Sequence, residues 1–121
     1  MLAYKLFGSG LNTLSVAAMG DVATALTATG TTSATAYGVT FAKNAFTTVA
    51  AGTGAVLDPN AAPGDSQLIY NGGANPLRVY PHVSTAQINN LGANAPAFVP
   101  AKTAAEFHML TSTLWTAVLS R

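Results

Sequence analysis

The chain has 121 residues, half of them apolar, with five Lys or Arg, four Asp or Glu and no Cys. Its 7% of charged residues is far below the roughly 25% of an average soluble domain. Disorder is not expected, because disordered chains are poor in apolar residues as well as biased in charge. A chain of this length is expected to form one domain that buries a core without metal or disulfide support.

The charge pattern argues against several classes of partner. The net charge is +1, and the basic residues are widely spaced at Lys5, Lys43, Arg78, Lys102 and Arg121. Nucleic acid is therefore not an expected partner, since phosphate binding needs several basic groups on one face. No apolar run reaches eighteen residues, so a membrane span is not expected either.

Residues 1–20 are expected to form an extended N-terminal arm. Gly8, Gly10 and Gly20 punctuate this segment, and a long helix through them would be costly. Its large apolar residues suit addition as a strand to a neighbouring subunit, or docking in a groove of a shell. The alternative is that the arm is the first strand of the chain's own sheet. The candidate assembly contacts are Leu2, Tyr4, Leu6, Phe7 and Leu11.

Residues 21–36 form an Ala- and Thr-rich connecting segment with no clear periodicity. Asp21 is able to cap a short helix over Val22–Leu26, but the β propensity of Thr competes with that helix. The sequence leaves both open. It also shows no evident internal repeat.

From residue 37 to residue 121 the pattern is that of an all-β domain, a compact sandwich or barrel of short antiparallel strands. Runs of β-branched and aromatic residues alternate with Gly, Pro, Asn and Asp. The expected strands are Val39–Ala42, Phe46–Val49, Ala55–Leu57, Gln67–Tyr70, Leu77–Tyr80, Phe98–Val99, Ala104–Met109 and Leu114–Leu119.

Two hairpins are expected within this domain. One has Lys43-Asn44 as its turn. The other is a structural hairpin in which Asn71 and Gly72 turn the chain, because Asn-Gly between β-type runs is a strong hairpin signal. Tyr70 and Tyr80 would then be cross-strand neighbours, a pairing that stabilises a hairpin.

The last expected strand carries the single Trp. Trp115, Ala117 and Leu119 share one face, and Leu114, Thr116 and Val118 share the other. Because both faces hold large apolar groups, cover on both sides is expected, with Trp115 in the core. A subunit contact for Trp115 is the alternative.

No motif predicts catalysis. Gly8-Ser9-Gly10 and Gly52-Thr53-Gly54 lack the third Gly of a dinucleotide loop and are expected to be turns. His82 and His108 are far apart and have no spaced carboxylates beside them, whereas zinc needs three or four ligands. Glu106 is expected to face solvent. The sequence predicts no enzyme, no metal site and no cofactor.

Three segments resemble a group of small virion-associated proteins of tailed bacteriophages. In that group an Asn-Gly hairpin ending in Val-Tyr-Pro leads to an Ile-Asn-Gly-Leu segment, an Ala/Thr-rich strand and a terminal Trp strand. The similarity runs from about Gly30 to Leu119, and this chain departs from the pattern at Asn90 and His82. The matching segments are Leu68–Pro81, Ile88–Ala95 and Pro100–Phe107.

The resemblance implies a structural role in a virion, as a capsid decoration (cement) protein. It implies that the major capsid protein and further copies of the chain, in a homotrimer, are the partners. The location would be the capsid surface, after assembly in the host cytoplasm. The alternatives are a tail or head-fibre component, or a carbohydrate-binding or host-attachment β module that would need Tyr70, Tyr80 and Trp115 exposed.

Overall fold

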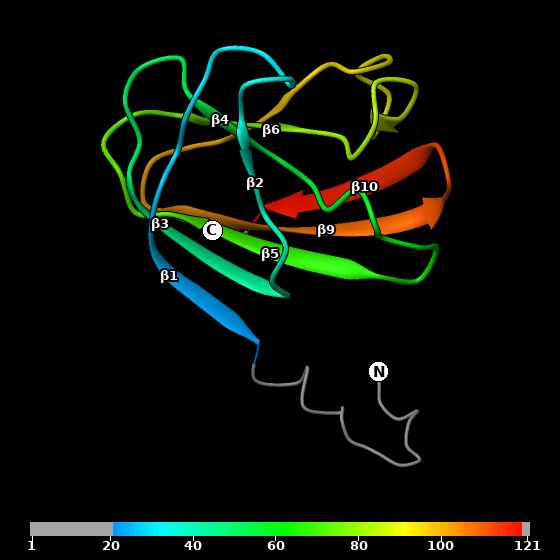
Figure 1. Ribbon diagram of the computed structural model, residues 1–121, viewed down its shortest axis with the longest axis horizontal. Coiled ribbons are helices and arrows are strands. Elements are labelled where there is room, and N and C mark those ends of the chain that lie inside the picture. Colours follow the sequence, from blue (N-terminus) through cyan, green and yellow to red (C-terminus); the bar gives the residue numbers. More distant parts are fainter. Residues whose placement is uncertain (1–20, 120–121) are drawn as a thin grey trace.

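The structure is a computed structural model that describes residues 21–119, and these residues form two β-sheets with no helix (Figure 1). The all-β expectation is confirmed. One sheet has six strands in the order β1-β3-β5-β9-β10-β7, and the other has four in the order β2-β4-β6-β8. The strands are β1 Val22–Thr27, β2 Tyr37–Gly38, β3 Lys43–Thr48, β4 Gly54–Val56, β5 Ser66–Asn71, β6 Leu77–Tyr80, β7 Gln87–Ile88, β8 Ala97–Val99, β9 Thr103–Thr111 and β10 Leu114–Leu119.

The first six strands alternate between the two sheets. The chain passes from β1 to β2, back to β3, and onward in the same way to β6, and the strands that stack within each sheet are parallel. This arrangement is a short stack of three coils, as in solenoid proteins. The Ala- and Thr-rich segment supplies β1, so the β propensity of its Thr residues prevails over the alternative of a helix capped by Asp21.

The expectation of antiparallel strands is therefore wrong for β1 to β6. Antiparallel pairing occurs at β5–β9, β9–β10 and β6–β8, where the chain closes one end of the stack. The repeat was hidden in the sequence because the coils differ in length. Val22 pairs with Lys43, and Lys43 pairs with Leu68, so successive coils differ by several residues.

Both expected hairpins are wrong. Lys43 and Asn44 begin β3 instead of forming a turn. β5 and β6 lie in different sheets, so Tyr70 and Tyr80 are not cross-strand partners. The Asn-Gly signal failed because the segment after Asn71 crosses from one sheet to the other.

Asn71 organises that crossing through its buried side chain. Its Nδ2 donates to the carbonyl oxygens of Asn75 and Val99, at 2.8 and 2.9 Å, and its Oδ1 accepts from the Gly73 amide at 2.9 Å. Gly72 does not have a positive φ. A Cβ at Gly72 would lie 2.9 Å from the Phe46 carbonyl oxygen, so this Gly is needed for close approach and not for a left-handed turn.

Successive coils are joined at their corners by backbone hydrogen bonds. The Gly72 amide donates to the Phe46 carbonyl at 2.7 Å, and the Ala28 amide donates to the Thr48 carbonyl at 2.9 Å. On the opposite side, the Leu57 amide donates to the Tyr80 carbonyl at 3.0 Å. Buried backbone polar groups are thus paired even where the chain leaves one sheet for the other.

The core lies between the two sheets. Inward positions of β3, β5, β9 and β10 alternate with outward ones, as strand geometry requires. Trp115 is fully buried, which confirms its expected core position. The outer face of β10 is only partly covered by the described residues, since Leu114 and Thr116 are half-buried and Val118 is 61% exposed, so the expectation of cover on both faces is wrong at Val118. The largest fully buried side chains include Trp115, Phe46, Phe107, Leu57, Ile69 and Leu77.

Candidate functional site

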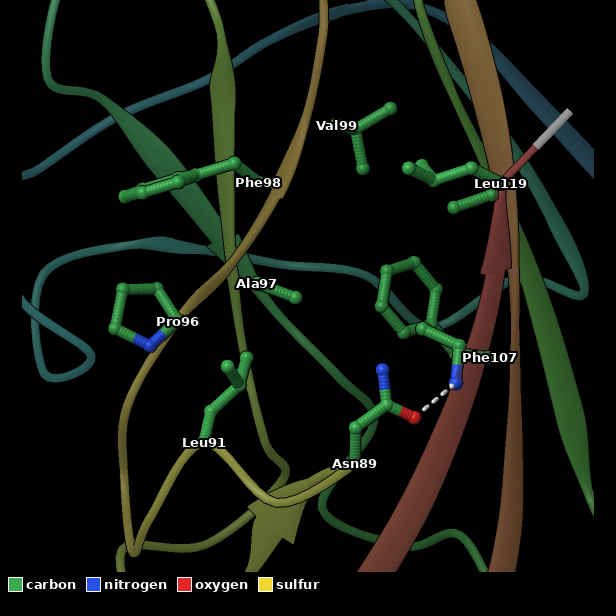
Figure 2. A pocket seen from close by; sticks show the side chains of 10 residues that line it. Asn89, Leu91, Pro96, Ala97, Phe98, Val99, Phe107 and Leu119 are labelled. Carbon is green, nitrogen blue, oxygen red and sulfur yellow. Dashed lines mark hydrogen bonds between the residues drawn. The ribbon is translucent and has the colours of Figure 1, made fainter. Parts of the chain in front are cut away.

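An apolar cavity of about 510 Å³ opens between β8 and β10, at the closed end of the coil stack. Figure 2 shows the labelled side chains arranged around this cavity, which we call the β10 pocket. Cavities of roughly 300–1,000 Å³ with mostly apolar walls and a few polar groups are typical ligand sites. The lining residues are Asn89, Leu91, Pro96, Ala97, Phe98, Val99, Ala105, Phe107, Ala117 and Leu119.

The wall opposite β10 is a loop built by turn-forming residues. Asn89, Asn94 and Gly92 all have a positive φ, a conformation that Asn tolerates better than most residues. The Asn94 amide donates to the Ala86 carbonyl at 2.9 Å, and the Ala95 amide donates to the Gly92 carbonyl at 3.2 Å. These bonds hold Leu91 in the wall of the pocket.

Three large apolar side chains in the pocket walls are open to solvent. Leu91 is 51% exposed, Phe98 is 56% exposed and Leu119 is 41% exposed. The floor is made by buried side chains, including Phe107 and Val99. The pocket therefore offers apolar surface that a binding partner would remove from water, at a gain of about 25 cal/mol per Å².

Asn89 is the polar group of the pocket. Its Oδ1 accepts a hydrogen bond from the Ala117 amide at 3.1 Å, and its side-chain nitrogen lies beside the open space (Figure 2). No hydrogen bond joins that nitrogen to the rest of the described chain. It is placed to donate to a carbonyl of a bound group.

The edge of β10 above the pocket is only partly paired. β7 pairs with β10 at Leu114 and Trp115 alone. The Asn89 amide donates to the Trp115 carbonyl at 2.7 Å, and the Asn89 side-chain oxygen accepts a hydrogen bond from the Ala117 amide. Because every second residue of a strand points its backbone groups to the same edge, the Ala117 carbonyl and the Leu119 amide face this open edge.

His82 lies against the buried Trp. Trp115 Nε1 donates to His82 Nδ1 at 2.9 Å, and the two rings meet edge to face with centroids 5.7 Å apart. Burial lowers the pKa of His82 from its ordinary 6.5. The hydrogen bond itself requires an unprotonated Nδ1, so the neutral imidazole is the form that fits this site.

His108 lies elsewhere, on the outer face of β9. Its Nε2 is 3.5 Å from Glu106 Oε1, and both side chains are largely open to solvent. Glu106 faces solvent as expected. The two His residues are thus not brought together, and no group of three or more His, Asp or Glu able to hold a metal occurs among residues 21–119.

Three of the four acidic residues line the same hollow, a grouping that no sequence pattern indicated. Asp21, Asp58 and Asp65 line a hollow of about 220 Å³ near the start of β5. Asp58 Oδ1 accepts from the Asn60 amide and Asp65 Oδ2 accepts from the Ala62 amide, both at 2.9 Å. Two of these carboxylates are thus hydrogen-bonded to backbone amides of the turns in which they lie.

The residues singled out in the sequence have different places in the structure. Asn71 and Tyr80 are buried, and Tyr80 donates its hydroxyl to the Thr31 carbonyl at 3.1 Å. Tyr70 is 39% exposed on the outer face of β5. The candidate assembly contacts Leu2, Tyr4, Leu6, Phe7 and Leu11 lie outside the described residues.

Sequence reasoning missed the β10 pocket. Leu91 and Phe98 were the available signals, as isolated large apolar residues among Asn, Gly, Ala and Pro. That signal is weak, because single exposed apolar residues are common on protein surfaces. Only the fold brings them next to Leu119.

No family model matches the chain, and neither the curated proteins nor the solved structures include a match. The described residues contain no helix long and apolar enough to cross a membrane.

Proposed function

We propose that this protein is a non-enzymatic structural component of a phage virion, and that it binds the assembled capsid as a decoration protein. The observation that carries the proposal is the exposed apolar surface around the β10 pocket, formed by Leu91, Phe98 and Leu119. Exposed apolar groups that gather in one region mark sites of interaction. A second support is the resemblance of three segments, Leu68–Pro81, Ile88–Ala95 and Pro100–Phe107, to small virion-associated proteins of tailed bacteriophages.

The composition of the surface also favours a role in an assembly. The outer face of β5, β9 and β10 carries Leu68, Tyr70, Leu110 and Val118, with the Glu106–His108 pair as its charged feature. A surface so poor in charge protects a free monomer weakly against association. A protein that spends its life bound in a symmetric shell does not need that protection.

The carbohydrate-binding alternative is less well supported. Sugar-binding platforms depend on exposed aromatic rings, and that hypothesis needs Tyr70, Tyr80 and Trp115 at the surface. Tyr80 is 5% exposed and Trp115 is fully buried, so only Tyr70 is available. The tail or head-fibre alternative differs from decoration in location alone.

Co-sedimentation with empty capsids of the source phage tests the proposal. We expect saturable binding at a fixed number of copies per shell, and a higher temperature of shell disruption when the protein is bound. Immunogold labelling of intact particles separates the head from the tail. Absence of binding to shells, or label confined to tails, would contradict the decoration role.

A further inference from the structure

The pocket and the open edge of β10 together have the features of a site for an extended peptide. Strand addition draws affinity from main-chain hydrogen bonds and specificity from pockets for alternate side chains. The Ala117 carbonyl and the Leu119 amide face the open edge, and the pocket lies beside the same two residues. Asn89 adds a side-chain donor for a peptide carbonyl.

The walls of the pocket define the chemistry of the occupant. Leu91, Phe98, Phe107 and Leu119 are apolar, and none of the residues that line the pocket is charged. A charged peptide would lose its hydration there without gaining an ion pair. The occupant is therefore an extended segment with large apolar residues at alternate positions.

This chain contains such a segment within residues 1–20. Leu2, Tyr4 and Leu6 alternate with smaller or polar residues, and in an extended conformation they share one face. We propose that the β10 pocket receives Leu2, Tyr4 and Leu6 from a second copy of the chain, with the backbone of that segment pairing with the end of β10. This inference rests on the proposed function, because it specifies how copies of the decoration protein contact one another.

The segment is long enough for a second copy to be the donor. The segment joins the fold at Asp21, next to β1, and β1 and β10 lie four strands apart in the same sheet. With strands ~4.8 Å apart, β10 is roughly 19 Å away from β1. A twenty-residue segment extends to at most about 66 Å, which is ample reach to a neighbour placed beside β1.

The segment and the pocket that it enters are different surfaces of the chain, so two closed arrangements satisfy the contact. When each copy donates to the next, the assembly closes into a ring, such as a cyclic trimer, if the rotation between copies allows it. When two copies exchange their segments reciprocally, the assembly is a two-fold dimer.

Oligomer mass in the full-length chain tests the inference. Light scattering across a dilution series should show a defined oligomer for the wild-type chain. The Leu91→Asp variant and the Leu119→Asp variant should each dissociate at concentrations at least about tenfold higher than those at which the wild-type oligomer dissociates. A variant with Leu2→Asp, Tyr4→Asp and Leu6→Asp should behave in the same way. Leu110→Asp is the matched control, because Leu110 is 54% exposed on β9 and does not line the pocket.

Cysteine crosslinking identifies the occupant. The chain has no Cys, so single-Cys variants at Leu2, Tyr4 or Leu6 can be mixed with a mass-tagged Leu91→Cys variant and oxidised. A disulfide between tagged and untagged chains supports the inference. If a variant that carries both an arm cysteine and a pocket cysteine, Tyr4→Cys with Leu91→Cys, crosslinks only within one chain, the pocket holds its own N-terminal segment and the inference is wrong.

The remaining outcomes separate this inference from the proposed function. A wild-type chain that is monomeric at all concentrations, or an oligomer dissociated equally by Leu110→Asp, overturns the inference even if the protein decorates capsids. An arm-linked oligomer that fails to bind capsids supports the inference and contradicts the decoration role. Circular dichroism on each variant excludes unfolding as the cause of dissociation.

Discussion

The hydrogen bond from Trp115 to His82 makes one imidazole responsible for a pH-dependent part of the stability. Protonated Nδ1 cannot accept the bond, and burial already lowers the pKa of His82 below 6.5 in the folded chain. As pH falls, the unfolded chain binds this proton first. The contribution of this hydrogen bond to the free energy of unfolding is therefore at its maximum above about pH 6.5, and it decreases as the pH drops below that value.

We expect the thermal midpoint to fall between about pH 7 and pH 5, and His82→Asn to remove part of that fall. Trp115 is the single Trp, so its fluorescence reports this site directly. His108→Asn is the matched control, because His108 lies on the outer face of β9. A His82→Asn variant with an unchanged pH profile would contradict the assignment.

Gly54 lies where the backbones of two adjacent strands approach each other closely. A Cβ at Gly54 would lie 2.6 Å from the Arg78 carbonyl oxygen, a contact between backbone groups of adjacent strands. We expect Gly54→Ala to destabilise the fold by about 1–3 kcal/mol, as overpacking in a rigid site does. Chemical denaturation measures the loss.

Gly38→Ala is the control for this substitution. Gly38 is in the neighbouring strand β2, and the nearest atom to its added Cβ would be 4.0 Å away, on Val56. Its φ is not positive, so Ala fits there and should leave the stability unchanged or slightly raised. Equal losses in the two variants would show that contact with Arg78 is not the cause.

At the scale of elements, the strands differ in how well their backbones are protected. β5 and β9 each have a strand on both sides, whereas β1 is at an edge of the six-stranded sheet. β1 also has an irregular register, with Ala25 at a φ of 57°. Irregular edge strands resist pairing with other chains, which is a common protection against aggregation.

The rates of amide hydrogen exchange should reflect these differences in backbone protection. We expect the amides of β5 and β9 to exchange slowest, through global unfolding, and those of β1 and of the two-residue β7 to exchange much faster. Mass spectrometry on peptic fragments measures the difference. Protection of β1 equal to that of β9 would show that its edge is covered in solution.

At the scale of the whole molecule, stability comes from apolar burial and backbone hydrogen bonds and owes little to charge. The acid–base contact found in residues 21–119 joins Glu106 to His108; it is exposed, and it is an ion pair only when His108 is protonated. Exposed pairs contribute about 0–1 kcal/mol. The chain should accordingly be insensitive to ionic strength.

We expect the thermal midpoint to change by only a few °C between about 0.05 M and about 1 M NaCl at pH 7, since screening has little charge to act on. Differential scanning calorimetry measures it. A change above about 10 °C, equivalent to more than 1 kcal/mol for a domain of this size, would contradict this expectation.

The local properties of the chain could be predicted from its amino-acid sequence. The β character and the span of β10 follow from side-chain alternation, and so does the shared face of Trp115 and Ala117. Alternation is a property of single strands, so it can be read without knowing their partners. The scarcity of charge is likewise visible in composition alone.

The pairing of the strands could not be predicted from the sequence, because it depends on the three-dimensional fold. A run such as Gln67–Tyr70 carries the same alternation whether its neighbour is Leu77–Tyr80 in a hairpin or Ala104–Phe107 in β9. The choice depends on contacts between distant residues, which a local pattern does not contain. The β10 pocket has the same origin, because Leu91, Phe98 and Leu119 meet only when the two sheets close around the core.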